Sequence, residues 1–286
     1  MKFLKIVMIL IVSCLYISSS TADFNYRDTR SWARRWPACG GRRQSPIDFT
    51  MRNVDESHRN HKIKFNNYGV MPKEITIHNI GWTVRADFAW DDEVPIISGG
   101  FFNGSYRLDT WYFHWDARSN NGSEHTAGGR SAAMELQHLY YKSEYGSVEE
   151  AANHEDGFIL LGDWLFTEKL KNDSVESQVF HQFLTKVPLV AKPGSSAKIE
   201  PFNLLSLVYP GANNITWIVY YGSLTIPPCT ENVMWLINTY THIIDKKLLK
   251  DIQTTVQFST GDDHNVREIQ PSNGRKLYLM SAELLS

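Results

Sequence analysis

The sequence predicts a single α+β domain dominated by strands. Its 286 residues are 42% hydrophobic and 13% aromatic, which is ample apolar material for one large core. The segments rich in aromatic and branched residues are short and are separated by turn residues, whereas helical periodicity is weak throughout. No internal repeat, low-complexity stretch or linker marks a boundary at which a second domain would begin.

Residues 1–22 have the layout of a signal peptide, so the mature domain is expected to comprise residues 23–286. Two lysines precede an almost wholly apolar run from Ile6 to Ile17, and Ser20 to Ala22 supply small residues for cleavage. The run is too short to span a bilayer comfortably, and a buried N-terminal helix is the alternative interpretation. No later stretch is apolar enough to span, and the C-terminal residues lack the tail of a lipid-anchor signal. The sequence thus predicts a secreted, extracellular protein with no membrane span or lipid anchor.

Charge and cysteine content narrow the function classes further. Lys and Arg number 29 against 31 Asp and Glu, so nothing indicates a surface for nucleic acid or membrane lipid. Removal of the signal leaves Cys39 and Cys229, which an oxidising compartment would either join in one bridge or leave as two separate buried thiols. Glycosylation sequons, which would make the secreted chain a glycoprotein, begin at Asn103, Asn121, Asn172 and Asn214.

The elements along the chain are expected to be short. The first segment, residues 32–48, mixes aromatic, Gly and Pro residues and indicates an ordered but irregular conformation. Strands are expected within 63–84, broken by turns, and at 109–115, 134–139 and 157–162. Short surface helices are expected at 147–152, 174–184 and 235–244, and further short elements at 204–208 and 217–221.

Two neighbouring strands of this set carry the candidate functional residues. Side chains two apart on a strand point to the same face. Tyr112 and His114 of the earlier strand therefore share one face, and so do Glu135 and Gln137 of the later strand. Gly122 to Thr126 forms their Gly/Ser/Asn-rich connection.

Several motifs give the chain a resemblance to a known family. They are Gln44-Ser45-Pro46-Ile47-Asp48, His114-Trp115, Gly122-Ser123-Glu124-His125-Thr126, Ser223-Leu224-Thr225-Ile226-Pro227-Pro228-Cys229 and Asn265 to Arg275. On these motifs the chain resembles the α-type carbonic anhydrases, secreted or cytosolic zinc enzymes that hydrate carbon dioxide, from about Trp32 to Leu279. The resemblance implies their fold, a large twisted, mainly antiparallel central sheet with short surface helices. It also implies a disulfide between Cys39 and Cys229, which many secreted members form.

The resemblance places the metal ligands of the family on Tyr112, His114 and Gln137. In the family all three are histidines, within His-x-His-Trp and Glu-Leu-His-Leu, so two of the three are replaced here. The Tyr112 phenol has an ordinary pKa of about 10 and would have to lose its proton to bind zinc well. The Gln137 amide oxygen is a poor zinc ligand beside imidazole. The resemblance therefore implies a carbonic-anhydrase-related pseudoenzyme with a degenerate zinc site, no cofactor and no functional catalytic residue.

Of the other site positions that the resemblance implies, some keep the residue of the family and others are replaced. Glu135 matches a carboxylate that orients a ligand histidine, and Glu124 and Thr225 match a pair that orients the zinc-bound hydroxide. Trp82 stands where the family has a proton-shuttling histidine and cannot titrate near neutral pH. The apolar wall of the pocket is expected to consist of Leu139, Leu160, Leu224, Val233 and Trp235, together with Ile226, which replaces a second threonine. Plain core packing is the alternative role for each of them.

Three functions follow from this pattern. The first is binding, either of an unknown extracellular protein or of a small ligand in the remaining cleft. The second is an active or weakly active zinc carbonic anhydrase that uses His114 with a rearranged ligand set such as His138. Because His138 is expected on the opposite face from Gln137, that set needs a bulge in the strand. The third, a structural role in an extracellular matrix, lacks the acidic repeats or Gly/Asn-rich tracts that would indicate it.

Overall fold

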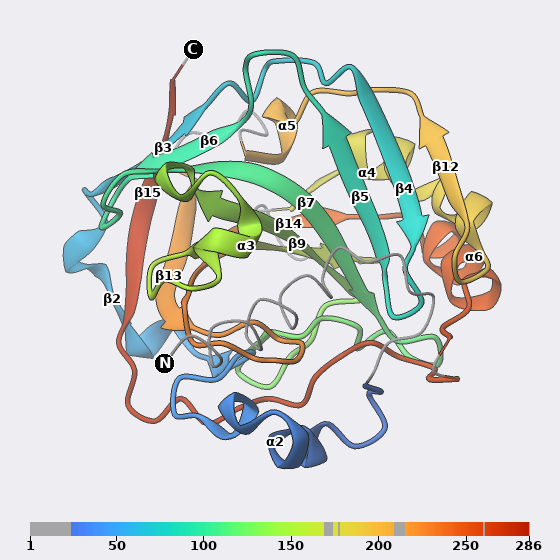
Figure 1. Ribbon diagram of the computed structural model, residues 1–286, viewed down its shortest axis with the longest axis horizontal. Coiled ribbons are helices and arrows are strands. Elements are labelled where there is room, and N and C mark those ends of the chain that lie inside the picture. Colours follow the sequence, from blue (N-terminus) through green and yellow to red (C-terminus); the bar gives the residue numbers. More distant parts are fainter. Residues whose placement is uncertain (1–23, 169–173, 177, 209–214, 260, 286) are drawn as a thin grey trace, which may run out of the picture.

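One large sheet forms the framework of the described residues, which are 24–168, 174–176, 178–208, 215–259 and 261–285 of the computed structural model (Figure 1). Its strands are β2 (Val54–Asp55), β3 (Lys62–Asn66), β4 (Glu74–Asn79), β5 (Val84–Ala89), β6 (Ile96–Gly99), β7 (Ser105–Trp115), β9 (Met134–Lys142), β10 (Phe158–Phe166), β11 (Ser174–Glu176), β12 (Ser196–Ile199), β13 (Thr216–Gly222), β14 (Val233–Ile243) and β15 (Leu277–Leu285). Strands β1 (Asp48–Phe49) and β8 (Thr126–Ala127) form a separate parallel pair.

The sheet is mainly antiparallel, as the resemblance implied. Its hydrogen-bonded order is β12-β4-β5-β7-β6-β3-β15-β13-β14-β10-β9, with β11 beside β14, β2 beside β15 and an additional pairing of β7 with β9. Among the described strands of this sheet, pairing is parallel only where β10 and β11 meet β14 and where β2 and β3 meet β15. The predicted strand-dominated fold with a large central sheet is thereby confirmed.

The helices are short and lie around the sheet (Figure 1). The α-helices are α2 (Trp32–Arg35), α3 (Val148–Ala151), α4 (Gln178–Leu184), α5 (Leu205–Val208) and α6 (Lys246–Thr255). The 3₁₀ helices are η2 (Thr29–Ser31), η3 (Pro37–Gly40), η4 (Met51–Asn53), η5 (Glu56–His58), η6 (Ser143–Tyr145) and η8 (Val187–Val190). Within the described ranges no helix has both the length and the apolar character needed to cross a membrane.

The helix expected at 147–152 and the helix expected at 235–244 have opposite outcomes. Ser147 caps α3 by accepting a hydrogen bond from the Glu150 N–H, which satisfies one of the free N–H groups of the first turn. The segment 235–244 is instead part of strand β14, so the helix prediction there was wrong. Residues 233–238 are buried on both faces between β10 and β13, and such a continuous apolar run shows neither helical nor strand periodicity. Residues 174–184 contain strand β11 before helix α4.

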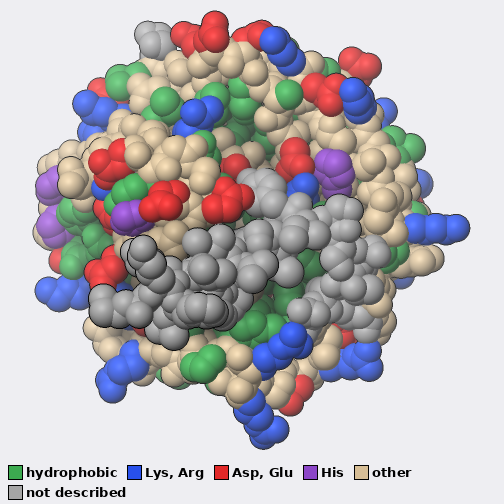
Figure 2. Space-filling view, viewed as in Figure 1, with side chains coloured by type: hydrophobic (Ala, Val, Ile, Leu, Met, Phe, Trp, Pro, Cys, Tyr) green, Lys and Arg blue, Asp and Glu red, His purple; other side chains and the backbone are tan. Residues whose placement is uncertain are grey.

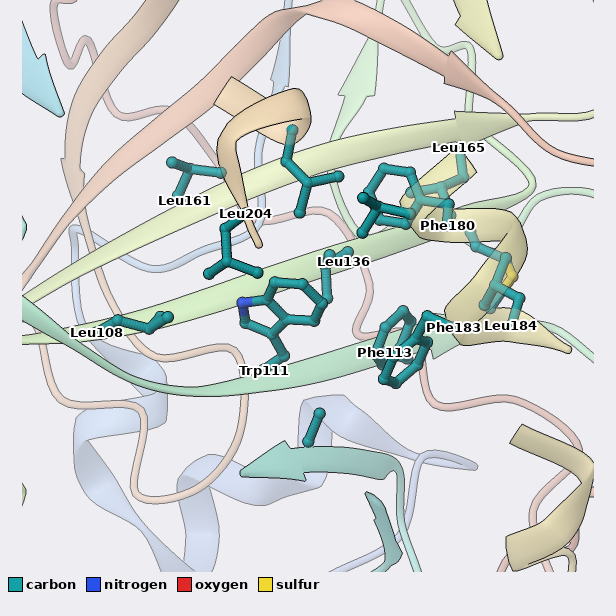
Figure 3. Close-up of a cluster of buried hydrophobic side chains, with 14 of the residues drawn as sticks. Leu108, Trp111, Phe113, Leu136, Leu161, Leu165, Phe180, Phe183, Leu184 and Leu204 are labelled. Atoms are coloured by element: carbon teal, nitrogen blue, oxygen red, sulfur yellow. The ribbon is translucent and has the colours of Figure 1, made fainter. Parts of the chain in front are cut away.

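The register of β7 against β9 sorts their side chains between two layers. Tyr112 lies opposite Gln137 and His114 opposite Glu135, whereas the intervening Trp111 lies opposite His138. Trp111 and its neighbours on that face pack into the main hydrophobic core, with α4 and α5 over them (Figure 3). The face that carries Tyr112 and Gln137 is left for the cleft described below.

The two cysteines form the disulfide that the resemblance implied. Cys39 and Cys229 are joined, with their Cα atoms 4.9 Å apart and a sequence separation of 190. The bridge fixes the N-terminal segment to the loop that follows β13. Buried Arg267 adds to this junction by donating from its guanidinium to the carbonyl oxygens of Ser45 and Cys39, at 2.7 and 3.1 Å.

The face of the molecule shown in Figure 2 carries charges of both signs. Figure 2 shows Lys and Arg side chains interspersed with Asp and Glu on the face in view, in keeping with the balanced composition. Asn103 and Asn121 are exposed, as a glycosylation acceptor must be, while Asn172 and Asn214 lie outside the described residues. The expected signal peptide, residues 1–22, also lies outside them.

Removal of the bridge should destabilise the fold without altering the sheet. The variant Cys39→Ala/Cys229→Ala is expected to lose about 2–4 kcal/mol of unfolding free energy, because its unfolded chain is no longer cross-linked across a long loop. Urea denaturation followed by circular dichroism measures this loss. Wild-type protein in excess reductant is the matched control and should unfold like the variant. Equal stability of variant and oxidised wild type would contradict the expectation.

Candidate functional site

A narrow cleft opens on the face of the sheet that carries Tyr112 and Gln137. Strands β7, β9 and β10 form its base, and the loop after β13 forms one side. The free space within it is about 30 Å³, more than the ~10–15 Å³ that one water molecule needs. Its lining residues are Trp82, Tyr112, His114, Gln137, Leu139, Val148, Phe158, Leu160, Leu224, Thr225 and Ile226.

His114 presents one fixed ring nitrogen to the cleft. Its Nδ1 lies 2.6 Å from the carbonyl oxygen of Asn265, and since a carbonyl only accepts, Nδ1 carries the hydrogen. In the neutral imidazole, Nε2 is then an acceptor. Asn265 is itself held by the Trp115 N–H, which donates to its side-chain oxygen, and by its own donation to the carbonyl oxygens of Trp82 and Phe113. The sequence motif containing Asn265 was recognised, but this contact was not predicted.

Gln137 is committed to two buried carboxylates. Its Nε2 donates to Glu124 Oε2 at 2.7 Å and to Glu135 Oε1 at 3.0 Å, so both amide hydrogens are used. The side-chain oxygen of Gln137 accepts no hydrogen bond from the rest of the described chain and borders the cleft.

Glu124 and Thr225 do not form the pair that the resemblance implied. Glu124 accepts from Gln137 on one oxygen and from the Arg267 N–H on the other, at 3.0 Å. The Gln137 amide thus binds the carboxylate that was expected to hold the Thr225 hydroxyl. Thr225 is only 3% exposed and lines the cleft, and its hydroxyl makes no hydrogen bond to the described residues.

Glu135 belongs to a buried network behind the cleft. It accepts from the His125 backbone N–H at 2.8 Å and lies 2.9 Å from His125 Nδ1. The other ring nitrogen of His125 lies 2.6 Å from the hydroxyl of Tyr220, which in turn meets Ser45. Burial alone raises the pKa of Glu135, but the contacts with His125 outweigh it, so that the net pKa is lowered. Sequence reasoning named His125 but missed Tyr220.

Tyr112 and Trp82 make an aromatic side of the cleft. Their rings stack with centroids 5.5 Å apart and planes inclined by 25°. Burial raises the pKa of Tyr112 well above its ordinary value, so its phenol keeps its proton at neutral pH. Trp82 therefore occupies the proton-shuttle position as a packing residue against Tyr112.

His138 is not brought to the cleft. Its Nε2 lies 2.9 Å from Asp163 Oδ2 on the opposite face of the sheet, and its ring packs against Trp111. The same carboxylate accepts from Asn238 and lies 3.6 Å from His242. No bulge interrupts the pairing of β9 with β7 from Thr110 to Trp115, so the face of His138 follows from the regular register.

The expected apolar wall is only partly the wall that the structure has. Leu139, Leu160, Leu224 and Ile226 line the cleft as expected. Val233 and Trp235 lie in the hydrophobic cluster behind it and are not among its lining residues. Val148 and Phe158, which were not predicted, complete the wall.

Metal-ligating side chains are sparse at this site. Across the described ranges, no group of three or more His, Cys, Asp and Glu side chains is arranged to hold a metal ion. At the three positions matched to ligands, the groups are an imidazole nitrogen, a protonated phenol and an amide whose nitrogen faces two carboxylates.

Comparison with known proteins gives one consistent family. The profile of the eukaryotic-type carbonic anhydrases matches residues 27–281. Carbonic anhydrase 6 of Canis lupus familiaris is 30% identical over 257 residues, which cover 87% of this chain and 76% of that protein. Carbonic anhydrase 6 of Bos taurus is 29% identical, with 87% and 76% covered, and carbonic anhydrase 7 of Homo sapiens is 29% identical, with 85% and 90% covered.

Replacement of the Gln137 amide should be costly for the fold. Gln137→Met keeps a similar shape but leaves Glu124 and Glu135 without their shared donor, and we expect a loss of about 2–4 kcal/mol at pH 7. Leu139→Met, on the same face of β9, is the matched control and should cost less than about 1.5 kcal/mol. Urea denaturation measures both. Equal losses in the two variants would mean that the carboxylates do not depend on the amide.

Asp163 should make stability depend on acid pH. Burial raises its pKa, but the contacts with His138 and His242 outweigh burial and lower it below the ordinary value. A lowered native pKa stabilises the fold above the unfolded value, about 3.9, and this stabilisation is lost as pH falls further.

Unfolding of Asp163→Asn measured between neutral and strongly acid pH tests this expectation. The variant should be less stable than wild type at pH 7 and should lose stability less steeply below about pH 4. Glu283→Gln, at an exposed position of β15, should leave the wild-type profile unchanged. Parallel pH profiles for Asp163→Asn and wild type would refute the assignment.

Proposed function

The chain belongs to the eukaryotic-type carbonic anhydrase family, and on that premise we propose that it is a secreted member without zinc-dependent carbon dioxide hydration, which acts by binding a small ligand in its cleft. The observation that carries this proposal is the position of Gln137. Where the family has a ligand histidine, this chain has an amide whose nitrogen bonds Glu124 and Glu135.

The donors at the cleft do not fit a catalytic zinc site. Such a site holds zinc with three protein ligands and leaves one position for water, whose pKa the metal lowers to about 7. Here His114 Nε2 is the one suitable nitrogen, the Gln137 oxygen is a weak ligand, and Tyr112 stays protonated. No step of hydration is therefore derived for this chain.

The residues that would act on a zinc-bound hydroxide are also differently engaged. Glu124 does not bond the Thr225 hydroxyl, and Trp82 offers no group that titrates near neutral pH. The alternative ligand set with His138 has no support from the contacts, because His138 bonds Asp163 on the other face of the sheet.

Secretion is supported by the apolar leader and by the bridge. Disulfides persist in oxidising compartments and are rare in the cytosol. The Cys39–Cys229 bridge, the balanced charge and the two exposed sequons are the combination expected of an extracellular protein.

Zinc content is the direct test of this proposal. Secreted protein dialysed against zinc-containing buffer should retain close to no zinc by elemental analysis, and it should hydrate carbon dioxide at the background rate. The variant Tyr112→His/Gln137→His restores the ligand set around His114 and Glu135 and should bind about one zinc per chain.

The single variant Tyr112→His is the matched control. It offers two imidazoles and should lose zinc on dialysis where the double variant retains it. About one zinc per wild-type chain, with hydration above background, would overturn the proposal.

A further inference from the structure

Three buried polar side chains leave hydrogen-bonding atoms unused at the cleft. His114 is 1% exposed and presents Nε2 as an acceptor. Gln137 is 3% exposed and presents its amide oxygen. Thr225, also 3% exposed, presents a hydroxyl that can accept. None of the three atoms has a hydrogen-bond partner within the described ranges, and all three residues line the cleft, where an occupant can reach them. The cleft therefore favours an occupant that donates hydrogen bonds.

Two carboxyl groups lie directly behind these acceptors. Glu124 and Glu135 are 1% and 0% exposed and share the Gln137 amide, which is neutral. His125 lies 2.9 Å from Glu135, and His114 Nδ1 lies 3.6 Å from Glu124. The buried Arg267 guanidinium bonds carbonyl oxygens elsewhere and acts on Glu124 through space, while its backbone N–H donates to that carboxylate. A positive group in the cleft would compensate this buried negative charge, whereas a negative one would be repelled.

The sides of the cleft suit an apolar group next to that charge. The Trp82 and Tyr112 rings stack on one side, and aromatic faces attract cations. Leu224 and Ile226 line it as well, so that most of its wall is apolar. The free space of about 30 Å³ admits a small polar head rather than a bulky one.

We propose that this cleft binds a small primary ammonium ligand with an apolar substituent. The three N–H groups of the ammonium donate to His114 Nε2, the Gln137 oxygen and the Thr225 hydroxyl, and the apolar substituent lies against Trp82 and Leu224. This assignment rests on the proposed function, because a zinc ion held by His114 would take the place of the ammonium. A zinc site that holds hydroxide accepts an anion, whereas this cleft would accept a cation.

A series of matched probes tests the assignment. Benzylammonium, benzyl alcohol and benzoate share one ring and differ in the charge and donors of the head group. Titration calorimetry of the mature secreted protein should show benzylammonium binding at least about tenfold more tightly than benzoate, with benzyl alcohol between them. Binding of benzoate equal to or tighter than that of benzylammonium would overturn the assignment.

Variants connect the binding to the named atoms. Thr225→Val removes one acceptor at nearly constant shape. Glu124→Gln removes one charge and keeps one of the two oxygens that now accept from Gln137 and Arg267. Each variant should weaken benzylammonium binding several-fold. Glu124→Gln should weaken the binding of uncharged benzyl alcohol less than that of benzylammonium. Glu283→Gln, remote on β15, should change nothing. Unchanged affinity in both cleft variants would show that the probe binds elsewhere.

Zinc analysis of the same sample separates the two possible failures. If the protein carries about one zinc per chain, the proposed function and the ammonium site fall together. If it carries none and still does not prefer benzylammonium, the ammonium site alone is wrong and the loss of zinc stands.

Discussion

The antiparallel register of β7 and β9 is the constraint on which the rest of the site depends. Because Tyr112 lies opposite Gln137 and His114 opposite Glu135, one face of two strands brings these four side chains together. A shift by one residue would place Trp111 and His138 there and send the polar groups into the hydrophobic core. Packing of that core against α4 therefore fixes the chemistry of the cleft from behind.

Gln137 sets the hydrogen bonding of the two buried carboxylates, Glu124 and Glu135. An amide supplies two hydrogens but no charge, so Glu124 and Glu135 are satisfied as acceptors while their charge is balanced only in part. The same amide takes the place at Glu124 that the resemblance assigned to Thr225. One substitution thus frees a hydroxyl at the cleft as well as removing a ligand nitrogen, and the two effects belong together.

The sequence sufficed for the fold and for the face of each β7 and β9 residue, because motifs and period-two alternation carry that information. It was wrong at residues 235–244, where burial on both faces of β14 erased the alternation. The sequence analysis also assigned Val233 and Trp235 to the wall of the cleft, whereas they lie in the cluster behind it. A sequence does not distinguish these two places, because both are occupied by apolar residues on the same strands. The bond between Gln137 and Glu124 was open to chemical reasoning, but its exclusion of Thr225 depends on distances that a sequence does not contain.

The disulfide also constrains the rim of the cleft. Cys229 closes the same loop that carries Thr225 and Ile226, and Cys39 ties that loop to a segment at the other end of the sequence. Before oxidation, the loop is held by non-covalent contacts such as the hydrogen bond from Gln44 to the Cys229 carbonyl oxygen. In a chain whose thiols are still reduced, the rim of the cleft lacks this covalent constraint, so the oxidation of Cys39 and Cys229 adds to the order of the cleft.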